Sequence, residues 1–564
     1  MDNQTLQPTS DPKLQSVSYV TILPEGKQSG YKPRERIDYK INATENPYFD
    51  GSKSYLLLNV NSDCAFSNAA AAITAAPPVC FPANMGANAL VNRLVARVND
   101  GTGRLIEDRE SYNLWNGIQN AYNHDSDVFP SLAKVEAVSG RNTNPVNQTC
   151  DNLGNQYFMP NGTTTGNASV GGNVSITNSF VIPVQLGIFS AFSDQHFAVP
   201  NIDMSGLHLT YHLETGNRSM QLLCSKLYQA ATINTIASQN RIKCVNPLTP
   251  LNVTFTDPVT FTIDVGECNP ELTVDGVPWS LDMLAWRVGQ PLVNIGDASQ
   301  ESVISSIEID SGLVKIVVTS DMATAGATTV KMGDVATRDY TITKCELRLL
   351  RTTPDVPTMK SIRRALQRGL NFNSTALYKI STASSLLNAV IDIPEALTRA
   401  LSLLAVPIQQ NKLNTLDQDN AYVYPRPDAL FQDTNQNNYS YQWQVKNTLI
   451  PNLQVDTNAL VDVKSDNCIL FQSVQMALRP MFKVRSLGDK IANDLNYDLD
   501  LPFFIPLLLA PQGSSFDLID ASPQLRLENS QSANLAQITA KLFHVFVCHT
   551  RKLTVVDDQV EINF

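Results

Sequence analysis

Two histidines four residues apart, His208 and His212, have the spacing in this sequence that is closest to a metal site. On a helix such a pair can share a zinc ion, with the glutamate of an HExxH motif as the base. That glutamate is missing here, and Leu207, Leu209 and Tyr211 alternate with polar residues as they do in a half-buried strand. On a strand the two imidazoles lie on one face, about two pleats apart. We therefore expect a polar outer or interface face and predict no metal site.

The remaining candidates for chemistry are weaker. Gly101 and Gly103 lack the third glycine of a dinucleotide fingerprint and the lysine of a phosphate-binding loop, so they predict a tight turn. There is no Gly-x-Ser-x-Gly elbow, and the adjacent Asp557 and Asp558 would point to opposite faces of a strand. The sequence therefore predicts no catalytic residues, no cofactor-binding residues and no cofactor, and the protein is not expected to be an enzyme.

The nine cysteines also argue against a bound metal. Their number is odd and none falls in a Cys-x-x-Cys pair. Scattered reduced thiols are the expected state, and neither a disulfide framework nor a zinc site is predicted.

Length and composition indicate a large β-rich protein. A chain of 564 residues is too long for one core, so two or more domains are expected. Charged residues make up 17%, below the usual quarter, and 26 glycines and 31 prolines suit strands joined by many turns. The formal net charge of −11 argues against direct nucleic-acid binding, which needs basic residues to neutralise phosphates. The N-terminus has no apolar signal region and residues 501–511 are too short to span a bilayer, so we expect a soluble protein made in the cytosol.

The first half reads as strands interrupted by one helix and one very long loop. Strands are expected at 36–41, 53–60 and 90–98. From Asp108 to Tyr122 the apolar residues recur at intervals of three and four, which predicts an amphipathic helix. The Gly/Asn/Thr-rich loop over 137–179 is far beyond ordinary loop length.

The stretch 180–214 organises the rest of the chain. An apolar run ending near Pro183 predicts a buried strand, a Pro-bounded corner follows, and 207–214 alternates as a strand with one wet face. Further on, 253–265 predicts a strand pair, 276–319 a compact β insertion, and 340–350 a closing strand.

The second half begins with a basic helical linker and then repeats the pattern of strands and a long loop seen in the first half. Residues 358–370 carry Lys360, Arg363, Arg364 and Arg368, which suit a bridging helix with a solvated face or, alternatively, contact with nucleic acid or an anionic membrane. An Asn/Gln/Tyr-rich loop is expected over 417–447. Strands are expected over 385–408, 468–480, 501–510, 524–529, 539–550 and 552–562.

The segments 90–122 and 180–214 resemble, in the right order, a D strand with its following helix and the E–F corner of double-jelly-roll major capsid proteins. These form the shells of polinton-like viruses, virophages and adintoviruses. The resemblance covers most of 35–564 and implies an all-β fold of two tandem antiparallel jelly rolls, with short helices and long loop insertions. The domains expected are an N-terminal arm at 1–34, a first roll at 35–353 with insertions near 137–179 and 216–335, a linker helix at 354–372 and a second roll at 373–564.

The resemblance also implies the partners and the place of action. It implies a homotrimeric, pseudo-hexameric capsomer of an icosahedral DNA virus, which contacts neighbouring capsomers, penton proteins and minor or cement proteins. The site of action would be the virion capsid, with synthesis in the host cytoplasm or a viral factory, and no direct sequence-specific nucleic-acid binding. Whether a membrane lies under the shell stays open.

Two other functions are compatible with the composition. A tandem β-sandwich glycan-binding adhesin or fibre protein would be expected to expose aromatic side chains on its loops, and 137–179 carries only Tyr157 and Phe158. A cupin-like enzyme would need a His/Glu metal set spread over neighbouring strands, and the six histidines are sparse.

Overall fold

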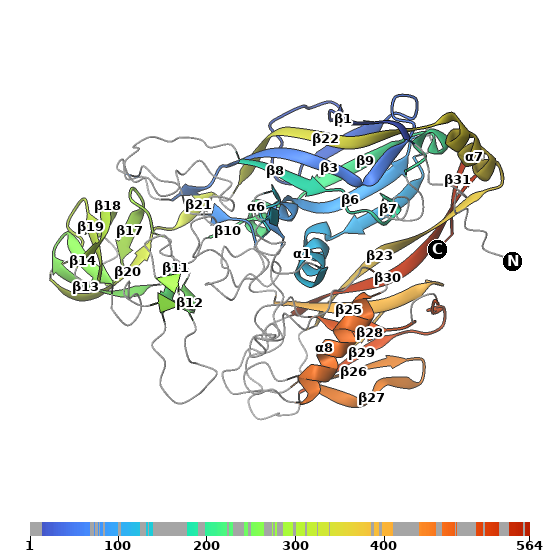
Figure 1. Ribbon diagram of the computed structural model, residues 1–564. Coiled ribbons are helices and arrows are strands. Elements are labelled where there is room, and N and C mark those ends of the chain that lie inside the picture. The colour runs from blue at the N-terminus through green and yellow to red at the C-terminus, as the bar shows by residue number, and fades with distance from the viewer. Residues whose placement is uncertain are drawn as a thin grey trace.

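The structure is a computed structural model (Figure 1). It describes residues 14–67, 73, 77, 79–82, 85–99, 103–123, 131–132, 135–138, 178–189, 198–222, 225–228, 242–245, 250–263, 273–274, 277–278, 286–296, 300–310, 313–323, 325–337, 339–384, 389–393, 397–409, 439–457, 465–479, 481, 504–510, 514–529, 541–556 and 559–563.

The first half forms two four-stranded antiparallel sheets, with strand orders β1-β22-β3-β8 and β2-β9-β6-β7. Their strands are β1 (Leu14–Ile22), β2 (Arg36–Ile41), β3 (Phe49–Ser62), β6 (Val91–Val98), β7 (Leu105–Glu110), β8 (Asn178–Pro183), β9 (Leu207–Leu213) and β22 (Tyr340–Pro354). Alternating burial along β2 and β22 shows that one side of each sheet faces a shared core.

The second half repeats this arrangement. Its sheets have the orders β23-β30-β25-β28, with β31 added on β30, and β24-β29-β26-β27. The strands are β23 (Leu370–Ser384), β24 (Ala389–Asp392), β25 (Ala400–Gln409), β26 (Tyr439–Val445), β27 (Thr448–Thr457), β28 (Ile505–Leu508), β29 (Gln524–Asn529), β30 (Lys541–Val556) and β31 (Gln559–Asn563).

Each half is a jelly roll. When the eight sheet strands of either half are lettered B to I along the chain, the two sheets read B-I-D-G and C-H-E-F, and this order is the same in both halves. The order defines two tandem antiparallel rolls, so the predicted fold class is confirmed. Strands B to I are β1, β2, β3, β6, β7, β8, β9 and β22 in the first roll and β23 to β30 in the second.

The remaining elements are short. The helices are η1 (Gly86–Leu90), α1 (Tyr112–Asn123), η2 (Asn201–Met204), α6 (Gly216–Ser219), α7 (Val356–Gln367) and α8 (Ser465–Leu478). Among the described residues, no helix is long and apolar enough to cross a bilayer. The short strands outside the rolls and the barrel are β4 (Ala65–Phe66), β5 (Val79–Cys80), β10 (Gln221–Leu222), β11 (Ser225–Tyr228), β12 (Ile242–Val245), β15 (Thr273–Val274), β16 (Val277–Pro278) and β21 (Val335–Thr337).

Four sequence-based expectations are wrong in detail. Residues 14–22 were expected in an arm that gains order only from neighbours, but they form β1, which pairs with β22 from Leu14↔Pro354 to Ile22↔Leu347. Residues 105–110 were expected to begin a helix, but they form β7, and the helix starts at Tyr112. Because these two strands were not predicted, the later strands of the first roll were given the wrong strand letters. Residues 90–98 are strand E, the helix follows F, and 180–214 spans the G–H corner.

The other two errors lie in the second roll. Residues 468–480 were expected to form a strand, but α8 occupies most of this stretch, with Val474, Ala477 and Leu478 buried at helical spacing. The loop expected over 417–447 ends earlier, because β26 begins at Tyr439. Residues 139–177 and 410–438 lie outside the described residues, as do residues 1–13.

Between H and I of the first roll the chain forms a closed six-stranded barrel, ordered β13-β14-β19-β18-β17-β20. Its strands are β13 (Leu251–Asp257), β14 (Thr260–Ile263), β17 (Pro291–Asn294), β18 (Glu301–Asp310), β19 (Leu313–Val318) and β20 (Gly326–Met332). The barrel has its own hydrophobic core around Trp286, Phe255 and Phe261, whereas the two rolls share one continuous core. The β insertion expected near 276–319 is therefore the larger part of a separate packing unit.

The long connections of both rolls leave from one end. In an antiparallel roll the B–C, D–E, F–G and H–I connections share an end, and the C–D, E–F and G–H connections share the other. The barrel, an H–I insertion, lies at the left of Figure 1, whereas α7 and β31 lie at the opposite end. The molecule therefore has one heavily decorated end and one plain end.

The separate core of the barrel predicts a local response to mutation. Trp286→Ala removes a fully buried indole and should cost ~3–5 kcal/mol within the barrel alone. Hydrogen–deuterium exchange should quicken over 251–332 and stay unchanged in β3, β22 and β30. Trp443→Ala, a matched change at a fully buried indole of the second roll, should quicken exchange there and leave the barrel as it was. Faster exchange throughout the rolls after Trp286→Ala would show that the two cores are one.

Candidate functional site: the junction between the two rolls

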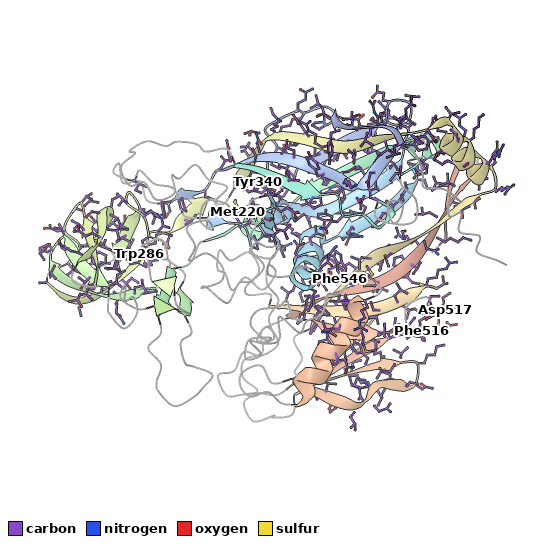
Figure 2. The ribbon with its side chains drawn as sticks, viewed as in Figure 1. Met220, Trp286, Tyr340, Phe516, Asp517 and Phe546 are labelled. Carbon is purple, nitrogen blue, oxygen red and sulfur yellow. The ribbon has the colours of Figure 1, made fainter. Side chains whose placement is uncertain are left out.

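The candidate functional site is the surface where the first roll packs on the second. From the first roll, the F side contributes β7, the helix α1 that follows it, and the segment 184–189 after strand G. From the second roll, strands β23 and β30 present the outer face of the B-I-D-G sheet. Figure 2 shows Phe546 of β30 directly beneath α1, so these segments are neighbours in space although more than 400 residues separate them in the chain.

A buried ion pair lies at the centre of the junction. Arg109 Nη2 donates to Glu107 Oε1 over 2.9 Å, and both side chains are almost completely buried. The backbone amides of Gly187 and Ile188 donate to the two carboxylate oxygens of Glu107 over 3.0 and 3.1 Å, and Arg109 Nη1 donates to the carbonyl of Gln185 over 2.6 Å. A buried pair is tolerated when further hydrogen bonds satisfy its atoms, and here these bonds also fix segment 184–189 against β7.

Two arginines then connect the rolls. Arg551 of β30 donates from Nη1 to the carbonyl of Ile106 in β7 over 2.7 Å. Burial lowers the pKa of Arg551, and the nearby Glu107 raises it, so the carboxylate offsets part of the effect of burying the guanidinium. Arg104, just before β7, donates to the carbonyl of Val560 in β31.

Gly187 allows the two backbones to approach each other. A Cβ at this position would overlap the carbonyl oxygen of Thr375 in β23. Only glycine permits this contact, because any other residue would place a carbon where the oxygen lies. The separation of segment 184–189 from β23 therefore depends on this one residue.

A second polar contact lies farther along β23. Lys379 Nζ donates to Ser111 Oγ over 2.7 Å, and burial lowers the pKa of the lysine. His544 on β30 is 2.8 Å from Ser381 Oγ through its Nδ1 atom, and burial, followed by Lys379, lowers the pKa of this histidine to about 3. Burial and Arg551 likewise lower the pKa of His549 to about 3. Both imidazoles are therefore neutral at neutral pH.

Aromatic contacts complete the junction. The rings of Trp115 and Phe546 lie 5.6 Å apart between centroids, and those of Tyr122 and Phe504 also lie 5.6 Å apart. Both pairs join α1 to the second roll, and pairs in this range contribute about 0.5–1.5 kcal/mol beyond their buried area. The junction therefore holds two rolls in one fixed relation, and its polar groups serve packing.

The sequence-predicted candidates lie elsewhere. His208 and His212 are on β9 and pair with Lys40 and Arg36 of β2, so both face the polar side of the C-H-E-F sheet. His208 Nε2 is 3.7 Å from Glu25 Oε2. In the described part of the chain, no three His, Cys, Asp or Glu side chains gather as metal ligands would.

Of the other candidates, Gly103 precedes β7, whereas Gly101, Asp557 and Asp558 lie outside the described residues. Cys64, Cys345 and Cys548 are buried free thiols. The basic linker forms α7, which Asp355 caps by accepting from the amide of Thr358 over 2.9 Å. Lys360, Arg363 and Arg364 are exposed on this helix.

The residues of the junction were not singled out from the sequence. A signal was present, because Glu107 and Arg109 interrupt a strand-like run and His544, His549 and Arg551 interrupt a long apolar run. Charged or titratable residues at such positions are costly to bury and so mark a specific partner. The sequence does not say which partner, since Arg109 and Arg551 lie 442 positions apart.

The strand order and the junction together define a double-jelly-roll protein. A scan against protein-family models finds no match, and no curated protein matches the sequence. The solved structures that are similar over nearly the whole chain include three of viral origin. The Sputnik virophage structure determined by cryo-EM is 11% identical with a TM-score of 0.49, over 100% of this chain and 92% of that one. The Faustovirus major capsid protein is 8% identical with a TM-score of 0.47, over 98% and 92%. The mavirus major capsid protein is 10% identical with a TM-score of 0.42, over 97% and 90%.

The close approach at Gly187 predicts a specific loss of stability. Gly187→Ala places a methyl group against the backbone oxygen of Thr375, which cannot move without disturbing β23. The expected cost is ~1–3 kcal/mol, the range for overpacking. Urea unfolding would measure it. Gly296→Ala in the barrel is the matched control, since the nearest atoms there are side-chain ends at 3.3 and 3.4 Å that can give way. Equal effects of the two changes would contradict the role given to Gly187.

The buried histidines predict a loss of stability in acid. The unfolded chain binds a proton at each histidine below pH ~6.5, whereas the folded chain does so only near pH 3, so stability is full above 6.5 and falls as the pH drops toward 3. Each histidine should contribute a loss of roughly 2 kcal/mol between pH 7 and pH 5. His549→Met should therefore narrow the difference in melting temperature between these two pH values.

The control for this experiment is Cys548→Ala. Burial raises the pKa of that thiol to about 12, so it stays protonated at both pH values. The substitution should lower the melting temperature equally at pH 7 and pH 5. A wild-type protein and His549→Met variant with the same pH dependence would show that His549 does not supply the effect.

Proposed function

We propose that this chain is a major capsid protein, which assembles as a homotrimer whose six jelly rolls form one pseudo-hexagonal tile of an icosahedral DNA virus shell. One observation carries the proposal. The same eight-strand order occurs twice in one chain, and a buried junction holds the two rolls side by side. Three such chains arranged around an axis present six similar blocks, which is what a tile needs to pack against six neighbours.

The shape of the molecule supports an orientation in the shell. Insertions gather at one end, where the barrel stands as a separate unit with its own core, and the other end is plain (Figure 1). An inserted unit with its own core can project without disturbing the rolls. We therefore place the decorated end, with the loop 137–179, on the outer surface of the particle, and the plain end with residues 1–13 toward the interior.

Partners and location follow as further parts of this proposal. The trimer would contact neighbouring capsomers, penton proteins and minor or cement proteins in the virion, after synthesis in the host cytoplasm or a viral factory. The net charge of −11 disfavours direct nucleic-acid binding. The proposed domains remain the arm, the first roll at 35–353, the linker at 354–372 and the second roll at 373–564, with β1 now added to the first roll.

The proposal predicts a stable trimer in solution. Two rolls side by side leave long sheet edges and flanks, which a closed ring covers with one interface repeated three times. Size-exclusion chromatography with light scattering should give three times the chain mass of 61.9 kDa at micromolar concentration. Electron micrographs of the purified protein should show pseudo-hexagonal particles or shells. A monodisperse species of 61.9 kDa would reject the capsid function and favour a monomeric adhesin.

A further inference from the structure

The junction inside the chain uses a different side of each roll. The first roll contributes its F side, which consists of β7, α1 and segment 184–189. The second roll contributes the outer face of its B-I-D-G sheet, through β23 and β30. Because both rolls have the same strand order, each has both kinds of surface. Within one chain, the outer B-I-D-G face of the first roll and the F side of the second roll are left without their counterpart.

The outer B-I-D-G face of the first roll carries exposed apolar and aromatic residues. Val17 and Tyr19 on β1 are 50% and 52% exposed. The ring of Tyr19 lies 5.7 Å from that of Tyr55 on β3, and Tyr19 pairs in register with Leu350 of β22. We call Val17, Tyr19, Tyr55 and Leu350 the receiving face.

The charges beside the receiving face are already paired. Lys344 Nζ is 3.0 Å from Glu346 Oε1, and Arg348 Nη2 donates to Glu346 Oε2 over 2.5 Å. These three side chains neutralise one another in part, so covering the face would not bury an isolated charge. In the second roll the equivalent strand is β30, and its Phe546 contacts Trp115 of α1, which covers this face.

The F side of the second roll carries a projecting leucine. Residues 451–454 bulge from β27, because Tyr441 pairs with Val455 and Trp443 pairs with Ile450. Gln442 Nε2 holds the bulge by donating to the carbonyls of Pro451 and Asn452 over 2.8 and 3.2 Å.

The F side of the second roll carries a second exposed apolar residue. Leu453 is 82% exposed, and Met476 of α8, the helix that follows β27, is 42% exposed. We call Leu453 and Met476 the inserting side. Asn452 and Gln454 flank the leucine, so the tip of the bulge carries no charge.

We propose that the inserting side of one copy docks on the receiving face of the next copy, and that this contact repeats the relation between the two rolls inside the chain. The inference rests on the proposed homotrimer and names the surfaces that close it. The two surfaces lie on opposite margins of the molecule, with β1 at the top and β27 at the bottom of Figure 1 and the junction between them. Such an arrangement gives a head-to-tail interface, which closes into a ring when the repeated rotation completes a full turn without a shift along the axis.

The apolar content of both surfaces favours a second copy as the occupant. A leucine that is 82% exposed at the tip of a fixed bulge, and two aromatic rings in tilted contact on an open sheet face, are costly to leave in water. Each surface corresponds by strand letter to one that is buried within this same chain. A second copy therefore supplies a matching partner for both surfaces at once.

Single-surface variants test the contact. Variant I, Leu453→Glu with Met476→Glu, blocks the inserting side, and variant R, Val17→Glu with Tyr19→Glu, blocks the receiving face. Each should elute as a monomer at micromolar concentration, with circular dichroism and melting temperature close to those of the wild type, since all four side chains are exposed. Val390→Glu is the matched control. Val390 is 57% exposed on β24, at the opposite edge of the sheet that ends in β27, and this variant should remain trimeric.

A mixture of the two variants gives the sharpest result. Variant R keeps an intact inserting side and variant I keeps an intact receiving face, so one good contact forms between them and only blocked surfaces remain. The equimolar mixture should therefore yield a dimer of twice the chain mass and no trimer. Variants I and R that stay trimeric beside a trimeric wild type would overturn this inference and leave the capsid function standing. A monomeric wild type would instead reject the function itself.

A photo-crosslink keeps the inference testable if a variant fails to fold. With Leu453 replaced by benzoylphenylalanine in the full chain, irradiation of the wild-type-like trimer should join this position to peptides from 14–22 or 343–352 of another copy. Crosslinks that fall instead in the barrel, in α7 or in β24 would overturn the proposed contact.

Discussion

The buried pair of Glu107 and Arg109 is the interaction on which the relation of the two rolls depends. The pair lies in strand F of the first roll. Glu107 accepts the amides of Gly187 and Ile188, and it raises the pKa of the buried Arg551 from the second roll. Breaking such a group by removing one member leaves an unpaired buried charge, which costs about 3–5 kcal/mol. A tilt or slide of the second roll would take Arg551 away from the carbonyl of Ile106 and from Glu107, and so would leave buried groups without partners.

One strand plan meets two environments in this chain, and the sequence differs accordingly. In β22 of the first roll buried residues alternate with partly exposed ones, as expected for a sheet with one open face. In the equivalent β30 both faces are covered, and Phe543, Val545, Phe546 and Val547 are all buried. The burial of residues at equivalent positions in the two rolls thus shows which sheet faces are covered within the chain. The same comparison identifies the faces that only another copy can cover.

The strand pattern of the sequence was enough to predict many strands in more than one domain, because alternation and turn residues are local signals. The two tandem jelly rolls were predicted from the resemblance of 90–122 and 180–214 to a known family. The strand pattern failed where tertiary contacts decide. Edge strand β1 has little apolar periodicity, and it forms because β22 supplies its hydrogen bonds. The Asp108 side chain suggested a helix start, yet it pairs with Arg93 across β6 and β7 and so stabilises a strand. The junction could not be predicted, since its partners are joined by contacts between distant segments.

The junction inside the chain and the proposed contact between copies differ in whether their surfaces can be exposed to water. This difference sets the order in which they form. The internal junction buries Glu107, Arg109, Lys379 and Arg551, none of which could be desolvated without partners already in place. It must therefore form as the chain folds. The receiving face and the inserting side hold apolar groups, and the ion pairs of Glu346 beside the receiving face form within one copy. A folded single chain can present these surfaces to water for a time, so folding of the two rolls precedes the docking of one copy on the next.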